Sequence, residues 1–596
     1  MRVIILLSFV AVQTLPARRS PGEDFAGQTV VEYSATEDFN VGGSGFTQTF
    51  HPSGLSGDGS PSVVIDVPVR GEKNWSVVHH SPVSTVAVQK GDRIVYELTA
   101  RVTGDPTDAG DIGVYAESAR PGDWSGRGGR MALTTEKRTY RRSVEAADDY
   151  GVGEMRLSIH LSPKAQTVEY FGAKVEVFPA DAPASALRLD GITWPGQSAD
   201  APWRAAAETR IDRLRCQDMR VSVHDADGRP VSGATVRAEL KRHRWRFGTF
   251  VGSKMLADTE DGRRYREAVL DRFNFVTLPA YLADWGWLSD DARRDYFRLA
   301  DWARSHGLPA RGHLLVYPGW SSSPGRWFDL PKDELRRRLE DHIPRAIAAF
   351  ESRGVTEWDV TNELRFNEEF MAEIGGLEIA ADWFKTARRL LPDGTLYLNE
   401  TFVINSGGNT ETEQAKLVSH FHTLRDAGAL IDGIGLQGHF DAELTPPERV
   451  IEILDRMAKL TGRIMITEMD MDNEDKAAQA DYLRDFYTAC FSHPAVEGIV
   501  RWGFWEGDMW RARGYDVARD WTEAPGGRMH RHLVKEKWHT DVTQTTGQDG
   551  EFRVRGYKGS YDVTVSHDGY TVTIPIELGD GPLEQVVVVP GSQPEK

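Results

Sequence analysis

Short apolar runs alternate with longer amphipathic runs from residue 245 to residue 540, and no other feature constrains the fold as strongly. The apolar runs have the length of β-strands, and the amphipathic runs have the length of helices. A chain that alternates in this way builds a parallel sheet, because each helix returns the chain to the side where the next strand begins. Eight strands over about 295 residues predict one (β/α)8 barrel.

The apolar periodicity locates the elements of this barrel. Strands are expected at 246–250, 273–277, 310–316, 357–361, 395–398, 433–436, 464–467 and 498–502. Helices between them include 291–306, 332–353, 379–391, 412–427, 446–460 and 474–491. All strands of such a barrel end at the same opening, so residues at the strand ends are the candidates for a functional site.

The chain before the barrel is rich in β patterns. Its 596 residues are too many for one hydrophobic core, so three or more domains are expected. Residues 21–180 carry short alternating runs, separated by Gly, Asp, Pro and Ser, which predict an all-β sandwich. The runs at 90–92 and 168–171 resemble those of jelly-roll carbohydrate-binding modules. Four aromatic residues are candidates for sugar stacking, although a place in the core is the favoured interpretation for each, since aromatic side chains bury large areas: Trp75, Trp124, Tyr140 and Tyr150.

The segments next to the barrel point to an interrupted domain. Residues 181–204 are rich in Pro, Ala and Asp and predict a linker. Residues 205–244 contain a helical stretch and two strand patterns, and 541–592 continue the same β style. Because two strands alone are only marginally stable, we expect both segments to form one small immunoglobulin-like domain around the barrel at 245–540. The alternative is two unrelated appendages.

The N-terminus has the pattern of an export signal. One positive charge precedes a short apolar run, and Ala17 follows as a candidate cleavage residue. This predicts a signal peptide at 1–20 and a secreted or periplasmic protein. The alternative is a buried strand at the start of the first domain. No later stretch approaches 18 uninterrupted apolar residues, so no membrane span is expected.

Charge and cysteine content narrow the range of partners. A net charge of −18 argues against nucleic acid or anionic membrane, because both favour an excess of Lys and Arg, and it suits a neutral substrate. Cys216 and Cys490 are expected to be buried free thiols. No His/Cys cluster has zinc-like spacing. We therefore expect no metal and no cofactor, and a monomer.

Two glutamates stand at strand ends in unusually specific surroundings. Glu363 follows Asn362 at the end of the fourth strand, and Glu468 ends the seventh. Two carboxylates at one barrel opening are what a glycosidase needs to protonate a leaving group and attack a sugar carbon. The other strands end in further polar or aromatic residues: His313, Asn399, Glu400, Gln437, His439, Asp470 and Trp502, with Trp510 eight residues later.

Five motifs in order give this set a family resemblance. They are Arg-Gly-His at 311–313, Trp-Asp-Val-Thr-Asn-Glu at 358–363, Asp-Gly-Ile-Gly-Leu-Gln-Gly-His at 432–439, Ile-Thr-Glu-Met-Asp at 466–470 and the Trp-Gly-to-Trp segment at 502–510. The chain from about 245 to 540 thereby resembles glycoside hydrolase family 10, the retaining β-1,4-xylanases. A structural role in the barrel rim is the alternative for each polar residue.

The resemblance implies a role for each matching residue. Glu363 looks like the general acid/base and Glu468 like the nucleophile; retaining chemistry places such carboxyls about 5–5.5 Å apart. Asn362 is implied to bind the sugar 2-hydroxyl. His439 is implied to hold Glu468, with Asp470 orienting the imidazole. The remaining implied substrate contacts are His313, Gln437, Trp502 and Trp510.

The sequence departs from the family pattern after the second strand. Pro279, Ala280 and Ala283 stand where the family has Glu, Asn and Lys, which grip the sugar on the non-reducing side. Each lost polar contact removes about 1–3 kcal/mol of positioning. This side is instead rich in aromatic residues: Tyr281, Trp285, Trp287, Tyr317 and Trp320. We therefore expect intact cleavage chemistry and a remodelled cleft.

Three hypotheses follow. The leading one is a retaining hydrolase that cleaves internal β-1,4 linkages of xylan or a related β-glycan polysaccharide. The second is the same chemistry on a different or decorated β-glycan, because the non-reducing side is remodelled. The third is a carbohydrate-binding protein without catalytic activity, which has no need of the Glu363 and Glu468 pair.

Overall fold

A computed structural model describes residues 27–590, except 37–38, 56–58, 70, 72, 74, 104–109, 124, 164, 183, 188, 320–326, 328, 409, 442 and 474. The expected signal peptide, Trp124 and Trp320 lie outside the described residues. The chain divides into two compact units, Met1–Asp190 and Gly191–Lys596. Within the described part of the chain, no helix is both long and apolar enough to cross a membrane.

The first unit is an antiparallel β-sandwich. One sheet contains β1 (Gln28–Ser34), β3 (Thr47–His51), β4 (Ser62–Val67), β6 (Arg93–Thr103), β9 (Arg138–Glu145) and β11 (Gln166–Phe178). The other has the order β2 (Val41–Gly43), β5 (Val77–His80), β10 (Met155–His160), β7 (Gly110–Ser118) and β8 (Gly126–Leu133). Tyr140 and Tyr150 are buried in the core between them, whereas Trp75 is 56% exposed. A short helix, α1 (Ala184–Leu187), ends the unit.

The second unit contains a closed parallel barrel, which confirms the predicted (β/α)8 fold. Its strands are β14 (Arg246–Phe250), β15 (Phe275–Pro279), β16 (Ala310–Val316), β17 (Glu357–Asn362), β18 (Thr395–Glu400), β19 (Gly433–Phe440), β20 (Ile464–Met471) and β21 (Val496–Arg501). The strands at the site, β17 and β20, are buried along their whole length. Buried strands of this kind have apolar neighbours on both faces, inside and outside the barrel.

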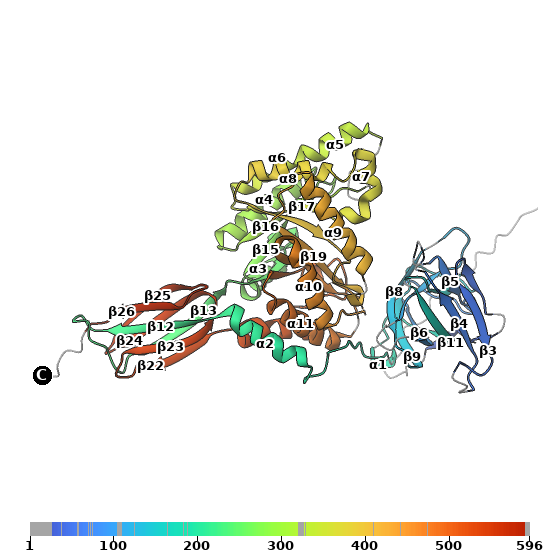
Figure 1. The fold of residues 1–596 in the computed structure, drawn as a ribbon, viewed down its shortest axis with the longest axis horizontal. Helices are drawn as coiled ribbons and strands as arrows, with labels where there is room; N and C mark the ends of the chain where they lie inside the picture. The colour runs from blue at the N-terminus through green and yellow to red at the C-terminus, as the bar shows by residue number, and fades with distance from the viewer. Residues whose placement is uncertain are drawn as a thin grey trace, which may run out of the picture. The chain divides into compact units, whose positions relative to one another are not determined.

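Helices surround this barrel (Figure 1). They are α3 (Glu260–Arg272), α4 (Asp290–Ser305), α5 (Lys332–Glu340), α6 (His342–Glu351), α7 (Glu368–Ile374), α8 (Ile379–Leu390), α9 (Glu411–Asp426), α10 (Pro447–Thr461), α11 (Lys476–Phe491) and α12 (Pro525–His532). Shorter helical turns are η1 (Ser253–Leu256), η3 (Leu364–Asn367), η4 (Ser406–Gly408), η5 (Glu506–Asp508) and η6 (Leu533–Lys537). Side-chain caps begin several helices, since Thr259, Ser289 and Asp475 each accept a backbone N–H in the first turn.

One predicted helix is two helices in the structure. The sequence analysis expected a continuous helix at 332–353, but α5 ends at Glu340 and α6 starts at His342. Pro344 explains the break, because it lacks a backbone N–H and its ring collides with the carbonyl four residues earlier in a continuous helix.

The segments that flank the barrel form one small β domain. The strands β12 (Cys216–His224) and β13 (Thr235–His243) precede the barrel, and β22 (Asp541–Thr545), β23 (Glu551–Tyr557), β24 (Gly559–His567), β25 (Tyr570–Leu578) and β26 (Leu583–Val588) follow it. β12 lies between β23 and β26, and β13 lies between β22 and β24. Figure 1 shows the green and red strands side by side. Both cysteines are free and buried, as expected.

The segment predicted as a linker is corrected in its second half. From Ile192 onward the chain packs on the barrel, where Trp194 is 4% exposed and its Nε1 donates to Asp485 at 3.1 Å. The helix expected at 205–215 extends as α2 (Pro202–Arg215), which contacts α11 of the barrel and also pairs through Asp212 with Arg555 on β23 of the small β domain. Composition alone missed this docking because Pro and Ala also occur at the starts of packed helices.

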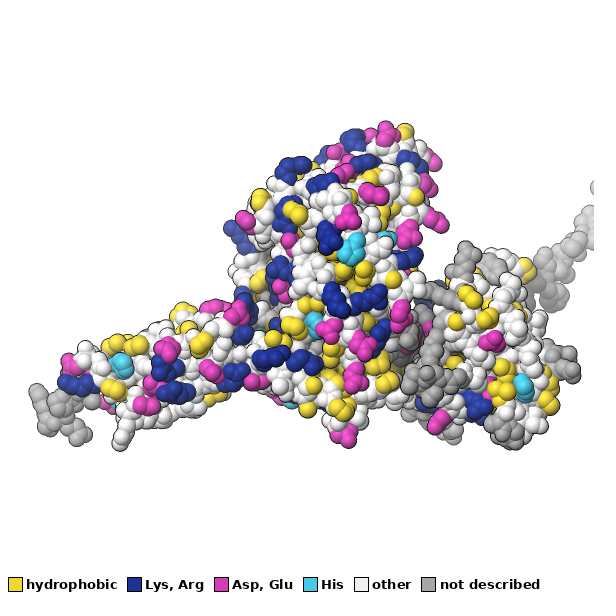
Figure 2. All heavy atoms as spheres, in the orientation of Figure 1, with side chains coloured by type: hydrophobic (Ala, Val, Ile, Leu, Met, Phe, Trp, Pro, Cys, Tyr) yellow, Lys and Arg dark blue, Asp and Glu magenta, His cyan; other side chains and the backbone are white. Residues whose placement is uncertain are grey.

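Charged side chains are mixed on the surface of the second unit. Figure 2 shows Lys and Arg interleaved with Asp and Glu over the visible face of the barrel and the small β domain. No large area of one sign stands out on that face.

Candidate active site

A cavity of about 630 Å³ lies at the carboxyl ends of the barrel strands. Eight of the nine predicted site residues line it: His313, Asn362, Glu363, Gln437, His439, Glu468, Trp502 and Trp510. The ninth, Asp470, is buried beside the cavity, next to His439. The remaining lining residues are Tyr281, Tyr317, Phe366, Thr401, Phe402, Asn405, Asp441 and Arg511.

Glu363 follows the last residue of β17 and is held on both carboxylate oxygens. Gln437 Nε2 donates to Oε1 at 2.9 Å, and the Tyr317 hydroxyl donates to Oε2 at 2.5 Å. The backbone of Glu363 is left-handed, with φ 55° and ψ 42°, and its N–H donates to the Asn399 carbonyl at 3.0 Å. This conformation costs a non-glycine residue about 1–3 kcal/mol, so the surrounding bonds impose it.

Glu468 lies within β20 and is 4% exposed. Asn399 Nδ2 donates to its Oε1 at 2.8 Å, His439 Nε2 lies 3.2 Å from its Oε2, and His313 Nε2 lies 3.9 Å from Oε1. Burial acts to raise the pKa of Glu468, but the charges of His313 and His439 and the Asn399 hydrogen bond outweigh it and lower the pKa. The carboxylate is therefore ionised at neutral pH.

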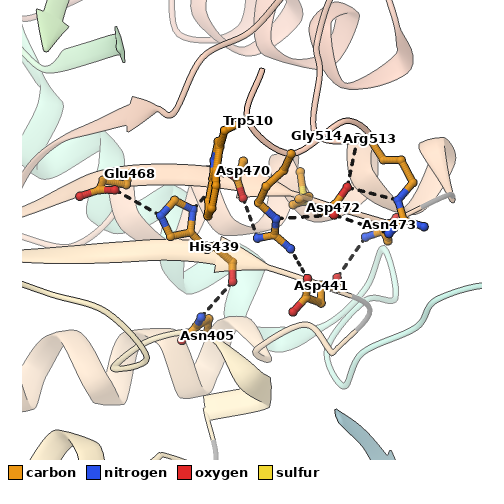
Figure 3. A network of polar contacts seen from close by, with 12 residues as sticks. Asn405, His439, Asp441, Glu468, Asp470, Asp472, Asn473, Trp510, Arg513 and Gly514 are labelled. Atoms are coloured by element: carbon orange, nitrogen blue, oxygen red, sulfur yellow. Dashed lines mark hydrogen bonds and ion pairs between the residues drawn. The ribbon is translucent and has the colours of Figure 1, made fainter. Parts of the chain in front are cut away.

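His439 links Glu468 to a buried aspartate (Figure 3). Its Nδ1 lies 3.1 Å from Asp470 Oδ2, and Asp470 also accepts hydrogen bonds from Trp510 Nε1 at 2.8 Å and Arg511 at 2.9 Å. Burial acts to lower the pKa of His439, but Asp470 and Glu468 raise it to about 10. At neutral pH the imidazole is therefore a cation between two carboxylates.

A chain of amide side chains joins the two glutamates. Gln437 Nε2 lies 3.1 Å from Asn362 Oδ1 and also donates to Glu363. Asn399 Nδ2 donates to the same Asn362 oxygen at 2.7 Å and to Glu468. These residues come from β17, β18 and β19, so neighbouring strand ends fix the relative positions of the two carboxylates.

His313 and the two tryptophans complete the cavity walls. His313 Nδ1 lies 2.8 Å from the buried Asp359, which also pairs with the buried Arg311. Trp502 packs against Phe250, with ring centroids 4.6 Å apart, and edge-on against His313 at 4.9 Å. Trp510 is 64% exposed, although its indole N–H is anchored to Asp470. An exposed, fixed ring is suited to contact a bound molecule.

Comparisons with known proteins decide the family. The family model described as glycosyl hydrolase family 10 matches residues 236–524. Endo-1,4-β-xylanase B of Thermotoga neapolitana is 30% identical over 275 residues, which cover 42% of this chain and 75% of that protein. This chain belongs to glycosyl hydrolase family 10.

Other relatives of this family 10 chain are longer. Anti-sigma-I factor RsgI6 of Acetivibrio thermocellus is 31% identical over 400 residues, 65% of this chain and 50% of that protein. Endo-1,4-β-xylanase 2 of Arabidopsis thaliana is 25% identical over 436 residues, 72% of this chain and 38% of that protein. This chain thus spans half or less of these two curated relatives. The solved xylanase 10B from Thermotoga maritima is 23% identical, with a TM-score of 0.42, and the match covers 49% of this chain and 96% of that one.

The positions that depart from the family 10 pattern present few polar groups. Pro279 belongs to β15, and Ala280 and Ala283 are buried at 0% and 5% exposure. Tyr281 takes the cavity position beside them, with its ring 5.3 Å from His313 and 5.1 Å from the exposed Trp285. Trp287 is buried and packs on His342, so it does not line the cavity.

Several family 10 site residues were missed from the sequence. Asn399 was noted at a strand end but given no role, and Tyr317 was noted only as an aromatic substitution. Arg511 and Phe402 lie in loops and Phe366 lies in the short helical turn η3, so none of them carried a periodic signal. Glu400 also ends a strand, but it is fully buried outside the cavity, where burial raises its pKa to about 8.

Proposed function

We propose that this protein is a retaining glycoside hydrolase that cleaves internal β-1,4 linkages of xylan or a related β-glycan by double displacement. The observation that carries the proposal is the contrast between two carboxylates in one cavity. Glu468 is surrounded by histidines and amide donors that favour its anion, whereas Glu363 accepts hydrogen bonds from the neutral groups of Tyr317 and Gln437. A carboxylate held as an anion is suited to act as the nucleophile, which leaves the second carboxyl of the same cavity for the acid/base role.

In the first step, the Glu468 carboxylate attacks the anomeric carbon of the sugar. The bond from that carbon to the glycosidic oxygen breaks, and the proton of the Glu363 carboxyl passes to the departing oxygen. The product is an ester between the sugar and Glu468. The cationic His439 favours the ionised nucleophile before attack and remains beside it as its charge is lost.

In the second step, water replaces the leaving group. The Glu363 carboxylate takes a proton from this water as its oxygen attacks the anomeric carbon, and the ester bond to Glu468 breaks. Two inversions restore the original anomer. Glu363 returns to its protonated state and Glu468 to its anion, so the cycle is balanced.

The remaining site residues are assigned to sugar binding. Asn362 uses its Oδ1 within the amide chain, which leaves its Nδ2 to donate to the sugar 2-hydroxyl. His313 and Gln437 border the same space, and Trp502 and Trp510 supply an apolar floor and wall. Asp470 acts through His439 by holding the imidazole toward Glu468.

Azide rescue of alanine variants tests these assignments. The substrate is a dinitrophenyl β-xylobioside, whose leaving group needs no acid. We expect Glu363→Ala to release dinitrophenol from it, and we expect added azide to convert the sugar on Glu468 into the β-glycosyl azide. Glu468→Ala should be inactive alone and yield the α-azide, since one displacement inverts the centre. On xylan, each variant should lose at least about 10²–10⁴-fold in kcat.

Glu369→Ala, at an exposed position on α7, is the matched control and should retain parental activity. Parental activity of Glu468→Ala, or an inverted anomer released by the parent in an NMR time course, contradicts the proposal.

A second candidate substrate is a decorated β-glycan. The observation that favours it is that Pro279, Ala280 and Ala283 replace the Glu, Asn and Lys of the family pattern, which bind the sugar, and that Tyr281 lines the cavity beside them. A site with few hydrogen-bonding groups discriminates weakly against added substituents. Reducing-end release from a panel of xylans and other β-glycans separates the candidates. Turnover of only a substituted or non-xylan polymer would favour the second.

A further inference from the structure

The second sheet of the N-terminal sandwich has an outer face with an unusual surface. On β10, Met155, Leu157 and Ile159 belong to the core, so the alternating residues Ser158 and His160 lie on the opposite face, where Ser158 is fully covered and His160 is partly exposed. The paired strands follow the same alternation: Tyr115 on β7 lies opposite Ser158, and His80 on β5 lies opposite Ser158 from the other side. All these residues therefore share one outer face.

Three rings form a continuous row at this face. Tyr115 and His160 lie with centroids 4.5 Å apart and planes at 30°, and His160 lies 6.1 Å from Trp75 at 52°. Trp75 is 56% exposed, which is high for a tryptophan. We call Tyr115, His160 and Trp75 the ring platform.

Two glycines let the Tyr115 ring lie across the strands. A Cβ atom on Gly128 would lie 2.6 Å from Tyr115 Cδ1, and one on Gly113 would lie 2.8 Å from Tyr115 Cε2. Gly128 lies opposite Tyr115 on β8, where a Cβ atom would also lie 2.2 Å from the Val114 carbonyl oxygen, and Gly113 lies on the same strand as Tyr115, where a side chain would displace the ring. The flat position of Tyr115 is therefore built into the sheet.

A polar network borders the platform. The Ser158 hydroxyl donates to Glu117 at 2.6 Å and lies 2.6 Å from His80 Nδ1, and Arg156 donates to Glu117 at 2.9 Å. Arg156 and Glu117 neutralise each other. Burial lowers the pKa of both His80 and His160, so their rings are neutral at pH 7. This face offers flat rings and uncharged hydrogen-bonding groups, with Lys73 near Trp75 as an added cation.

We propose that the ring platform binds a neutral glycan chain. A sugar ring presents C–H groups on its faces and hydroxyls at its edge, which match flat aromatic rings bordered by the partly exposed side chains of His80, Arg156 and Glu117. The balance of Arg156 and Glu117 suits an uncharged ligand better than a nucleic acid or an acidic protein. The inference goes beyond the proposed hydrolysis, since no residue of the platform belongs to the barrel. Binding here tethers the polymer and raises its local concentration for the same chain.

Affinity electrophoresis of the full-length chain tests the platform. The gel contains one of three polymers: arabinoxylan, mixed-linkage β-glucan or hydroxyethylcellulose. All variants carry Glu468→Ala so that the polymer is not hydrolysed during the run. We expect Trp75→Ala to weaken retardation by about fivefold, and Trp75→Ala with Tyr115→Ala to weaken it further. Gly113→Ala, whose Cβ atom meets the Tyr115 ring first, should also weaken it.

Leu55→Ala is the matched control, because Leu55 is an exposed apolar residue bonded through its backbone to Glu169 of the other sheet. It should be retarded like the parent. Thermal unfolding checks that each variant is folded. The proposal is overturned if the parent is not retarded by any of the three polymers, or if Trp75→Ala with Tyr115→Ala stays within twofold of the parent.

A separate measurement keeps this proposal apart from the proposed hydrolysis. In the background with Glu468 intact, Trp75→Ala should hydrolyse soluble xylotetraose at the parental rate, because a short substrate gains nothing from a tether on another unit of the chain. If Trp75→Ala lost as much of its hydrolysis rate on xylotetraose as it lost of its retardation in the gel, Trp75 would act through the barrel, and the proposed binding by the ring platform would be overturned. Failure of the parent to cleave any xylan leaves the binding measurement unaffected.

Discussion

At the scale of single residues, charge alternates along one line of side chains beside the cavity. The order is Glu468, His439, Asp470 and Arg511, and each contact in the line is 3.2 Å or shorter. Buried charges are tolerated only when each is paired, and here every member has an opposite charge on at least one side. Glu468 is thus held as an anion by His439, and the positive charge of His439 is in turn stabilised by Asp470 on its other side.

His439→Gln tests this arrangement through the pH dependence of kcat/KM. Without the imidazolium, burial acts on Glu468 with less opposition, so the pKa of Glu468 rises. The acid limb, where the nucleophile becomes protonated, should therefore move to higher pH. The control is His493→Gln, which removes a buried histidine paired with Asp455 outside the cavity. An unchanged acid limb in His439→Gln contradicts the assigned role.

At the scale of elements, the loop after β21 is anchored to the strand ends by two arginines, Arg511 and Arg513, of which Arg511 lines the cavity. Arg511 donates to Asp470, pairs with Asp441 and lies 3.7 Å from Asp472, while the neighbouring Trp510 faces the cavity. The loop therefore gains its position from β19, β20 and the residues just beyond them rather than from its own secondary structure.

Arg511→Met should disturb catalysis more than folding. Loss of three anchoring contacts frees Trp510 and removes a cation from Asp470, so we expect kcat/KM on xylan to fall about 10–100-fold. Arg519→Met, an exposed arginine further along the same loop, should have little effect. Steady-state kinetics measure the difference, and equal rates for the two variants would refute the anchoring role.

The helix α2 is held on the barrel by several polar contacts, one of which ends on a buried carboxylate. Arg204 donates to both oxygens of Asp485, at 2.6 and 2.8 Å, and Asp485 is fully buried on α11. Arg204→Met leaves this carboxylate with Trp194 and Arg484 only, so we expect a loss of about 1.5–3 kcal/mol in the free energy of unfolding.

Urea denaturation measures this loss. Arg213→Met, at an exposed position of the same helix, should leave the free energy of unfolding unchanged. Adding Asp485→Asn to Arg204→Met should recover part of the loss, because the buried group is then uncharged. No recovery would mean that packing of α2, rather than the charge, carries the effect.

At the scale of the whole molecule, the small β domain makes the two ends of the second unit depend on each other. Its core combines Val221 and Val236 from before the barrel with Phe552, Val563 and Val565 from after it. Neither group of strands can cover its apolar face alone.

A truncation at residue 540 should therefore be far less soluble than the full chain. It leaves β12 and β13 without β22–β26, which exposes their apolar face and unpaired edges. A chain that starts at residue 191 keeps every barrel and small-domain strand and should remain folded and cleave soluble xylooligosaccharides. Soluble yield, limited proteolysis and xylotetraose hydrolysis compare them. A soluble, protease-resistant truncation at 540 would show that the two segments are independent.

The sequence by itself determined the barrel and the positions of its chemistry. Strand and helix periodicity is local, and residues that end parallel strands meet at one opening, so Glu363, Glu468 and His439 could be placed in one site without coordinates. The prediction of one continuous helix at 332–353 was wrong, although Pro344 is a local signal for the break.

Only the tertiary structure decided which side chains touch. The bond from Tyr317 to Glu363, the bridge of Asn399 between Asn362 and Glu468, and the approach of Arg511 to Asp470 all join residues far apart in the chain. Such contacts depend on strand register and loop path, which no local pattern encodes. The segment after Ile192 is a further example, because its composition predicted a linker. Only the hydrogen bond from Trp194 to Asp485 shows that this segment packs on the barrel.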